Sequence, residues 1–525
     1  MLLSGIIFLV MTIPLASQYL STILIHRFAL LIMLYSALLS YNTLYVIPLS
    51  SGIGLLGGLF QTNLLSTSLE IFIFIIGSII LLLVPEGKLI STVGKHNTVE
   101  NSYTAGNTAS LLSYWDNLSS NVKVVASSTN LNKLKDYPLI ILFTTLGMSS
   151  LISSSDLITM FLAIELQSFA LYILATMNRN SESAVAAGLK YFLLGGLSSC
   201  FILLGSSLIY SFTGLTNFES LNILQSVIEL SQDNIYNYLA IGTIILTIGF
   251  LFKIGAAPLH SWSPDVYDGV PTIVTTWLAI MPKLSILIFF IMNNFLINPN
   301  LFMISALLSL LLGSITGLAQ YKIKRLLAYS TINHVGLILY GLTCNNLTGT
   351  ESTIFYIVQY SLTSINTFFI IILLGYSLPI NKRISEYSPI QYISQLRGQF
   401  YQNPVLSLAL ALSLFSMAGI PPLIGFFGKY FVINAALING NYFFSIAIVI
   451  SSVITAVYYL QVIKTLLLPE ESNSNITTSY SENNNLSPIL ANVVAILTLF
   501  IIFFMINPTV ILNSIHLITT SFYYY

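Results

Sequence analysis

Long apolar segments recur along the whole 525-residue chain and constrain its fold more than any other feature. A helix needs about 20 apolar residues to cross the roughly 30 Å hydrocarbon core of a bilayer. Only 7% of the residues are charged, whereas soluble domains carry about 25%. The sequence therefore predicts an all-α polytopic membrane protein and excludes a soluble globular one.

The apolar pattern predicts about fourteen transmembrane helices. We interpret the first as a span rather than a cleaved signal peptide, because it is long and poor in early positive charge. The predicted ranges are 2–24, 28–49, 67–84, 138–153, 157–177, 184–213, 238–260, 270–293, 299–321, 326–347, 352–378, 403–437, 441–468 and 486–515.

These helices group into five predicted units. They are an N-terminal three-helix segment (1–84), a polar loop (85–137), two five-helix blocks (138–293 and 299–468), and a polar loop with the C-terminal helix (469–525). The two blocks contain helices 4–8 and 9–13. An offset of five helices inverts orientation, so the blocks are predicted to be inverted repeats, a common transporter plan.

The distribution of basic residues predicts the orientation. Of the 18 Lys and Arg residues, fourteen lie in or beside loops that follow odd-numbered helices, and the loops after even-numbered helices hold none. Positive charge marks the cytoplasmic side of a membrane protein, or its equivalent. The odd-numbered loops are therefore expected on that side, and both termini on the other.

The remaining four basic residues, Lys190, Lys253, Lys283 and Lys429, lie inside predicted spans, as does Glu165 in the fifth helix. A charge at the bilayer centre costs about 3 kcal/mol even on the most forgiving scale. Snorkelling explains Lys190 as well as a functional role does, because it is near its helix end. One carboxylate cannot neutralise the deeper amines. Burial favours a neutral amine, so such lysines can take and give protons as a relay.

Prolines interrupt two of the helices that carry buried lysines. Pro258 follows Lys253 in the seventh helix, and Pro421 begins a proline pair before Lys429 in the twelfth. His260 lies seven residues past Lys253, about two turns or roughly 10 Å along the same face. Broken backbone at membrane depth is tolerated only where protein or water satisfies it. Helices 7 and 12 are thus predicted to be broken at wet proton-transfer sites; simple packing kinks are the alternative.

His334 lies in the tenth helix, which corresponds to the fifth in the predicted repeat. Histidine titrates near neutral pH, so His334 is either a relay member or a hydrogen-bonded interior residue. Other chemistry has no visible place in the chain. Cys200 and Cys344 form neither a disulfide framework nor a metal motif, and dinucleotide, P-loop and zinc-protease motifs are absent. A net charge of zero gives no indication of nucleic-acid binding.

Five stretches resemble the chain 2 family of NADH–ubiquinone oxidoreductase, the antiporter-like membrane subunits of mitochondrial respiratory complex I. They read FLAIELQSFALYILA, GLKYFLLGG, FKIGAAPLHSWSPDVYDGVPT, KRLLAYSTINHVG and SMAGIPPLIGFFGKY. The resemblance implies proton translocation driven by quinone reduction in other subunits. It also implies a central axis made of Glu165, Lys190, Lys253, Lys283 and Lys429, with His260 in the broken seventh helix.

The resemblance further implies that NADH, FMN, iron–sulfur clusters and ubiquinone bind other subunits. The expected partners are complex I chains 4 and 4L, accessory subunits and lipids such as cardiolipin. The expected location is the mitochondrial inner membrane of a fungal-type organism, with organelle encoding and the odd-numbered loops in the matrix.

The expected mechanism begins with a Lys190–Glu165 pair that controls Lys253. The proton then passes through Lys283 to Lys429, with His260 as a side branch. Two alternatives stay open. One is a stand-alone cation/proton antiporter, although no intramembrane aspartate cluster offers oxygen ligands for sodium. The other is a purely structural spacer of the membrane arm.

Overall fold

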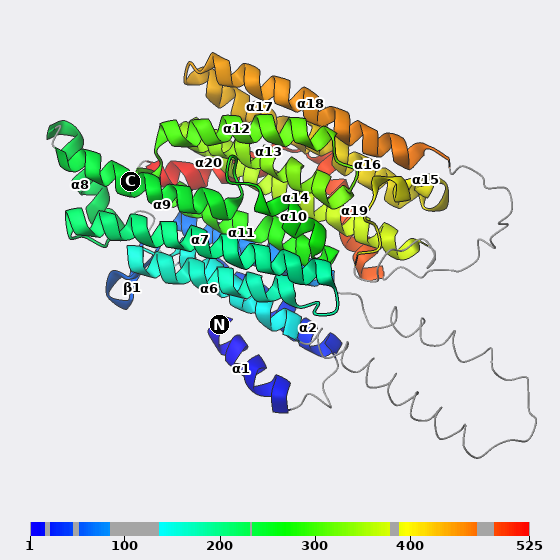
Figure 1. Ribbon diagram of the computed structural model, residues 1–525, viewed down its shortest axis with the longest axis horizontal. Coiled ribbons are helices and arrows are strands. Elements are labelled where there is room, and N and C mark those ends of the chain that lie inside the picture. Colours follow the sequence, from blue (N-terminus) through cyan, green and yellow to red (C-terminus); the bar gives the residue numbers. More distant parts are fainter. Residues whose placement is uncertain are drawn as a thin grey trace, which may run out of the picture.

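The computed structural model describes residues 2–15, 22–45, 52–83, 136–231, 234–378, 388–469 and 488–523. Within these ranges the regular secondary structure is helical apart from one small hairpin (Figure 1). Nine helices of the described ranges are long and apolar enough to cross a membrane, and several shorter apolar helices accompany them. Most of the two predicted polar loops lies outside the described residues.

The N-terminal segment contains three helices and the hairpin. The apolar, glycine-rich stretch after the second helix folds as an antiparallel pair of strands whose turn residue Leu56 is exposed. Its edge is held by a hydrogen bond from the Gln61 amide to the carbonyl of Ser153. The elements are α1 (Leu2–Leu15), α2 (Thr22–Thr43), β1 (Ile53–Leu55), η1 (Leu56–Gly58), β2 (Phe60–Thr62) and α3 (Leu64–Leu81).

The first predicted five-helix block follows. One helix in it, α8, was predicted as loop; it is amphipathic rather than uniformly apolar, which is why a search for spans passes over it. The elements are an unlabelled helix over Asp136–Ile152, then α6 (Leu157–Thr176), α7 (Glu182–Thr213), α8 (Phe218–Ser231), α9 (Asn234–Ile254), α10 (Trp262–Gly269) and α11 (Thr272–Met292).

The second block and the C-terminal part complete the chain. The single last helix predicted over 486–515 is wrong: Pro508 cannot continue a helix, and two helices form around it. The elements are η3 (Asn294–Leu296), α12 (Pro299–Leu318), α13 (Ile323–Thr343), α14 (Leu347–Ser377), η5 (Ile393–Leu396), α15 (Gln399–Gln402), α16 (Pro404–Ala418), α17 (Ile424–Ile438), α18 (Tyr442–Leu467), α19 (Pro488–Phe503) and α20 (Thr509–Tyr523).

The two predicted helix breaks are present, and glycine starts each of them. Gly255 (φ 76°) follows the last residue of α9, and Gly419 (φ 87°) follows the last residue of α16. Glycine adopts this left-handed conformation without steric cost, so it ends helices readily. Helix resumes only at Trp262 and at Ile424, beyond the prolines.

The loops gather at two opposite ends of the bundle. At one end, which we name the even face, Asp156 pairs with Asn217, and both belong to loops after even-numbered predicted helices. At the other end, the odd face, Lys322 pairs with Tyr392, from loops after odd-numbered predicted helices. The chain therefore alternates direction through the bundle as the predicted topology requires, while the two inverted repeats and the five unit boundaries stay predictions.

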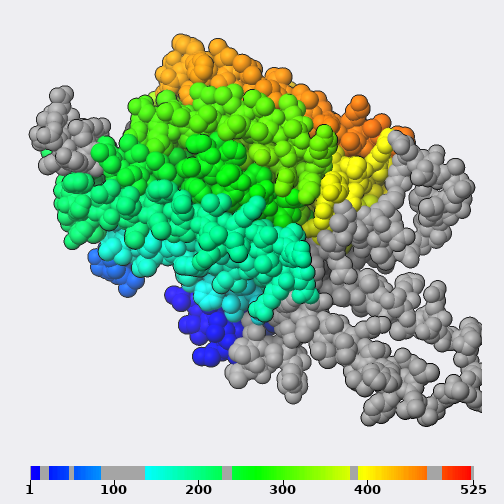
Figure 2. Space-filling view, in the orientation of Figure 1, coloured from blue at the N-terminus to red at the C-terminus, as the bar shows by residue number. Residues whose placement is uncertain are grey.

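Three helices form the centre of the bundle. In their most apolar windows, α11 is 94% buried and both α13 and α14 are 89% buried, whereas α7 is only 28% buried. Figure 1 shows α18 at one side of the helical bundle and α6 and α7 toward the other side, with α1 beyond them. In the space-filling view, the orange residues of α18 and the cyan to green residues of α7 occupy opposite sides of the visible face (Figure 2). Buried polar groups are therefore placed mainly on or beside α11, α13 and α14.

Candidate functional site

A buried ion pair joins α6 to α9. Lys253 Nζ lies 2.9 Å from Glu165 Oε1, and the two side chains are only 8% and 15% exposed. A buried charge requires such a partner, because an uncompensated one is strongly destabilising. The expectation that Lys190 is the partner of Glu165 is therefore wrong: Lys253 occupies that place.

Lys190 instead pairs with Asp265 on α10, at 2.9 Å, with side chains that are 55% and 40% exposed. The register of two antiparallel helices explains the difference. Gly195 on α7 lies against Tyr172 on α6, and from this level Lys190 and Glu165 lie in opposite directions. At 1.5 Å per residue they are about 18 Å apart along the helix axes. The exposure of Lys190 agrees with the snorkelling alternative.

The end of α9 places Lys253 beside a small cavity. Its volume is about 20 Å³, which is enough for one water molecule. Polar side chains face it from neighbouring helices, including Gln167 and Ser168 of α6. Ser285 of α11 donates a hydrogen bond of 3.1 Å to Gln167, so polar groups continue from the cavity toward Lys283.

Lys283 is the most deeply buried lysine of the predicted axis, with 2% of its surface exposed on α11. Its Nζ donates a hydrogen bond of 2.8 Å to Thr331 Oγ1 on α13. The ammonium also lies 5.6 Å from the centre of the Tyr267 ring, within cation–π range. Lys283 therefore touches both predicted blocks, since Thr331 belongs to the second.

His334 follows Thr331 by three residues on the same face of α13. Its Nδ1 lies 2.7 Å from the hydroxyl of Tyr356, and its Nε2 lies 3.3 Å from the hydroxyl of Tyr459. Both ring nitrogens thus have partners, as the interior-histidine alternative requires. A Cβ on Gly428, the residue before Lys429, would lie 3.2 Å from the ring of Tyr356, so the hydrogen-bond partners of His334 adjoin α17.

Lys429 on α17 bonds to the broken end of the preceding helix. Its Nζ donates a hydrogen bond of 2.7 Å to the carbonyl of Ala418, the last residue of α16. The side chain is 6% exposed, and a Cβ on Gly419 would press against its stem. A helix C-terminus carries partial negative charge and stabilises a cation. The predicted break therefore supplies the partner of Lys429.

His260 does not lie where the sequence predicts. It was expected on the same helix face as Lys253, but α9 ends at Ile254 and His260 falls in the irregular segment before α10. Its ring contacts Tyr329 of α13, with centroids 6.3 Å apart. The glycine at 255 redirects the chain, so a helical spacing cannot be extended across it.

An aromatic cluster, which sequence reasoning missed, separates Lys253 and Lys283 from the even face. Phe250 precedes Lys253 by three residues, and Phe289 and Phe290 follow Lys283 by about two turns. Ring centroids in the cluster are 5.1 to 6.0 Å apart. Beyond it lies an amide-lined cavity of about 580 Å³. The cluster contains Phe218, Phe250, Phe289, Phe290 and Phe302, all buried.

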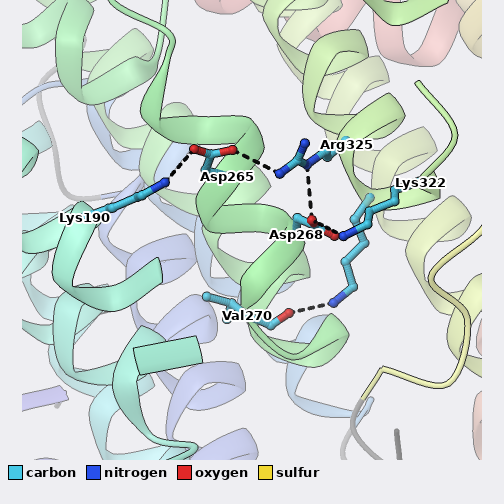
Figure 3. A network of polar contacts seen from close by, with 7 residues as sticks. Lys190, Asp265, Asp268, Val270, Lys322 and Arg325 are labelled. Carbon is cyan, nitrogen blue, oxygen red and sulfur yellow. Dashed lines mark hydrogen bonds and ion pairs between the residues drawn. The ribbon is translucent and has the colours of Figure 1, made fainter. Parts of the chain in front are cut away.

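Sequence reasoning also missed a charged network at the odd face, around α10 (Figure 3). Asp265 joins Lys190 to Arg325 of α13, and Asp268 accepts from both Arg325 and Lys322. Lys322 and Arg325 were counted only as loop charges, and Lys190 was expected to pair with Glu165 instead of Asp265. The described residues contain no group of three or more His, Cys, Asp and Glu side chains that could hold a metal ion.

The chain is similar to known membrane proteins over most of its length. The family profile described as NADH:quinone oxidoreductase/Mrp antiporter, TM, matches residues 154–455. NADH-ubiquinone oxidoreductase chain 2 of Rhizopus oryzae is 48% identical over 100% of both chains. The chain 2 protein of Marchantia polymorpha is 38% identical over 70% of this chain and 73% of its own.

Solved structures share the fold. A chain of respiratory complex I from Thermus thermophilus superposes with a TM-score of 0.70 at 24% identity, covering 98% of this chain and 99% of that one. A chain of the archaeal membrane-bound sulfane sulfur reductase superposes with a TM-score of 0.76 at 21% identity, covering 99% and 96%.

Proposed function

Given that the chain belongs to the NADH-ubiquinone oxidoreductase chain 2 family, we propose that its buried lysines form a proton relay through the membrane arm of respiratory complex I. The chain is a multi-pass inner-membrane subunit of this proton-translocating enzyme. The observation that carries the relay is the pair of amines, Lys283 and Lys429, that lie buried with only a hydroxyl or a carbonyl as hydrogen-bond partner among the described residues.

The relay begins at the Glu165–Lys253 pair. At 2.9 Å the charge of each partner acts directly on the other, so a proton that moves at one group changes the field at the other. The one-water cavity beside Lys253, together with Gln167 and Ser285, supplies polar groups between this pair and α11. A proton that leaves Lys253 can therefore move along these polar groups toward Lys283.

Transfer from the first block to the second runs through α13. Lys283 donates to Thr331, and His334 stands one turn further along the same helix. The hydroxyls of Tyr356 and Tyr459 can accept or donate at the two His334 nitrogens. These groups form a buried polar sequence that ends near Lys429.

The direction of release follows from what lies beyond each lysine. Toward the even face, the phenylalanine cluster fills the space past Lys253 and Lys283, and apolar packing of this kind excludes the water that proton transfer needs. Beyond Lys429, the even end of the second block carries polar groups such as the Asn346–Asn439 hydrogen bond. We assign release to Lys429 and place the odd face toward the matrix.

The chain takes part in the enzyme without redox chemistry of its own in this proposal. NADH, FMN, iron–sulfur clusters and ubiquinone bind other subunits, and chains 4 and 4L and lipids such as cardiolipin are its neighbours. A stand-alone cation/proton antiporter and a structural spacer are the competing functions. The spacer gives no reason for amines buried at a cost of several kcal/mol.

Lysine-to-methionine substitutions test the relay. We expect Lys253→Met, Lys283→Met and Lys429→Met each to lower the number of protons translocated per electron in the reconstituted complex, while the complex still assembles. Lys464→Met is the matched control, because Lys464 is an exposed lysine near the end of α18. Normal stoichiometry in all three variants contradicts the relay and favours the spacer. Transport of a metal cation by the isolated chain favours the antiporter.

A further inference from the structure

The short helix α10 is held by charges on both of its sides. Asp265 accepts from Lys190 of α7 through one oxygen and from Arg325 of α13 through the other, at 2.9 and 3.2 Å. Asp268, one turn later, accepts from Arg325 at 3.1 Å and from Lys322 at 2.8 Å. Figure 3 shows Asp265 and Asp268 on α10 between Lys190 and the basic side chains of α13. The position of α10 therefore depends on these pairs.

The first residue of α10 connects this network to the buried site. The indole nitrogen of Trp262 donates a hydrogen bond of 2.8 Å to the carbonyl of Phe252, which directly precedes Lys253. The indole also stacks on Tyr191 of α7, with ring centroids 4.9 Å apart and planes inclined by 21°. Trp262, Tyr191 and Phe252 all line the one-water cavity beside Lys253. A movement of α10 thus changes the wall of that cavity.

Lys190 is the part of the network that can move most easily. It adjoins Tyr191 in sequence, and its side chain is 55% exposed. Exposed ion pairs contribute little free energy, so this pair can open without unfolding the region. Arg325 still holds Asp265 when Lys190 leaves, so α10 stays attached to α13 while its contact with α7 loosens.

We propose that α10 is an access gate for Lys253: the Lys190–Asp265 pair keeps Trp262 seated on Tyr191 over the cavity, and release of Lys190 opens the cavity to water from the odd face. The gate proposal rests on the proposed relay, because the gate admits the proton that the relay then carries. In this arrangement Lys190 and Asp265 are positioning residues. They act on Lys253 through the position of α10, without contacting it.

Hydroxyl-radical footprinting of the complete complex in lipid nanodiscs tests the gate, because it measures water access to individual aromatic side chains. We expect Asp265→Asn and Lys190→Gln each to raise the oxidation of Tyr191 about two- to fivefold. Loss of one exposed ion pair changes the ratio of the open gate to the closed gate by a factor of this size. Glu351→Gln is the matched control, since it removes the distant Glu351–His516 pair. In this control variant, Tyr191 should be oxidised to the same extent as in the unsubstituted complex.

A second variant separates the gate from general loosening. Trp262→Phe removes the indole donor to Phe252 but keeps a ring to stack on Tyr191, so it should raise the oxidation less than Trp262→Ala. Unchanged oxidation of Tyr191 in both Asp265→Asn and Lys190→Gln overturns the gate, even when Lys253→Met still lowers the proton stoichiometry. Normal stoichiometry in Lys253→Met, with raised oxidation in the ion-pair variants, overturns the relay and leaves a water gate without a proton path.

Discussion

Thr331→Val removes the side-chain hydroxyl that accepts a hydrogen bond from Lys283 and joins it to the second block. Thr331 is 1% exposed on α13 and accepts from Lys283 Nζ at 2.8 Å. Valine has nearly the same shape, so the packing around α11 and α13 should persist while the amine loses its acceptor. A hydrogen bond to a charged group contributes about 1.5–3 kcal/mol. If that contribution is lost in the transfer step, proton movement slows by roughly 10- to 150-fold.

The assay is coupled NADH oxidation by the complex reconstituted in liposomes, with a pH-sensitive dye in the lumen. We expect turnover and luminal pH change to fall together in Thr331→Val, because transfer between the blocks becomes rate-limiting. Thr367→Val is the matched control: Thr367 is a fully buried threonine of α14 whose hydroxyl donates to the Ser364 carbonyl of the same helix. Parental rates in Thr331→Val would refute transfer through α13.

Three further substitutions probe other parts of the site. Phe250→Ser should raise the passive proton leak of the reconstituted vesicles several-fold, since it replaces an apolar ring between Lys253 and the even face. The leak is driven by a potassium-diffusion potential in the absence of NADH. An unchanged leak would contradict the role of the phenylalanine cluster as a barrier to water. Gly425→Ala should destabilise the complex by about 1–3 kcal/mol, measured by thermal melting, because the added Cβ meets the backbone of α16. Gly196→Ala is the control: its Cβ would lie in open space, so the melting curve should not change. Glu165→Gln leaves Lys253 without its counter-charge, a perturbation of about 3–5 kcal/mol; we expect proton translocation to be lost while native gels still show the assembled complex, and retained translocation argues against the pair.

Sequence patterns predict the spans and the buried lysines because both follow from the cost of polar groups in hydrocarbon. The breaks in the seventh and twelfth helices are predictable for the same kind of reason, since proline cannot donate a backbone hydrogen bond. Each break begins at a glycine, Gly255 or Gly419, that precedes the proline in the sequence. Glycine is a weaker helix breaker than proline, so the prolines give the stronger signal. These features depend on short stretches of chain and require no knowledge of neighbours.

The partner of Glu165 could not be predicted, because it depends on the register between helices. A shift of one helix by about three turns decides whether Lys190 or Lys253 faces the carboxylate, and apolar helix surfaces carry no visible sign of that shift. Thr331 was missed for a related reason. Hydroxyl side chains are common in these helices, and only the packing of α11 on α13 singles out this one as the acceptor for Lys283.

The network around α10 was missed because its acids looked like loop residues. Asp265 and Asp268 lie beyond the last residue of the predicted seventh helix, where charge needs no explanation. Their role becomes visible only when α7 and α13 bring Lys190 and Arg325 to either side. The phenylalanine cluster could not be recognised in the sequence, because the chain contains 32 phenylalanines and nothing in the sequence distinguishes these five from phenylalanines that only pack in the core.

A high-resolution density map of the assembled complex tests the central claim most directly, by showing where ordered water lies between the buried amines. The relay predicts water beside Lys253 in its cavity and between His334 and Lys429, with none inside the phenylalanine cluster. Dry, close-packed side chains in both of these gaps would contradict it.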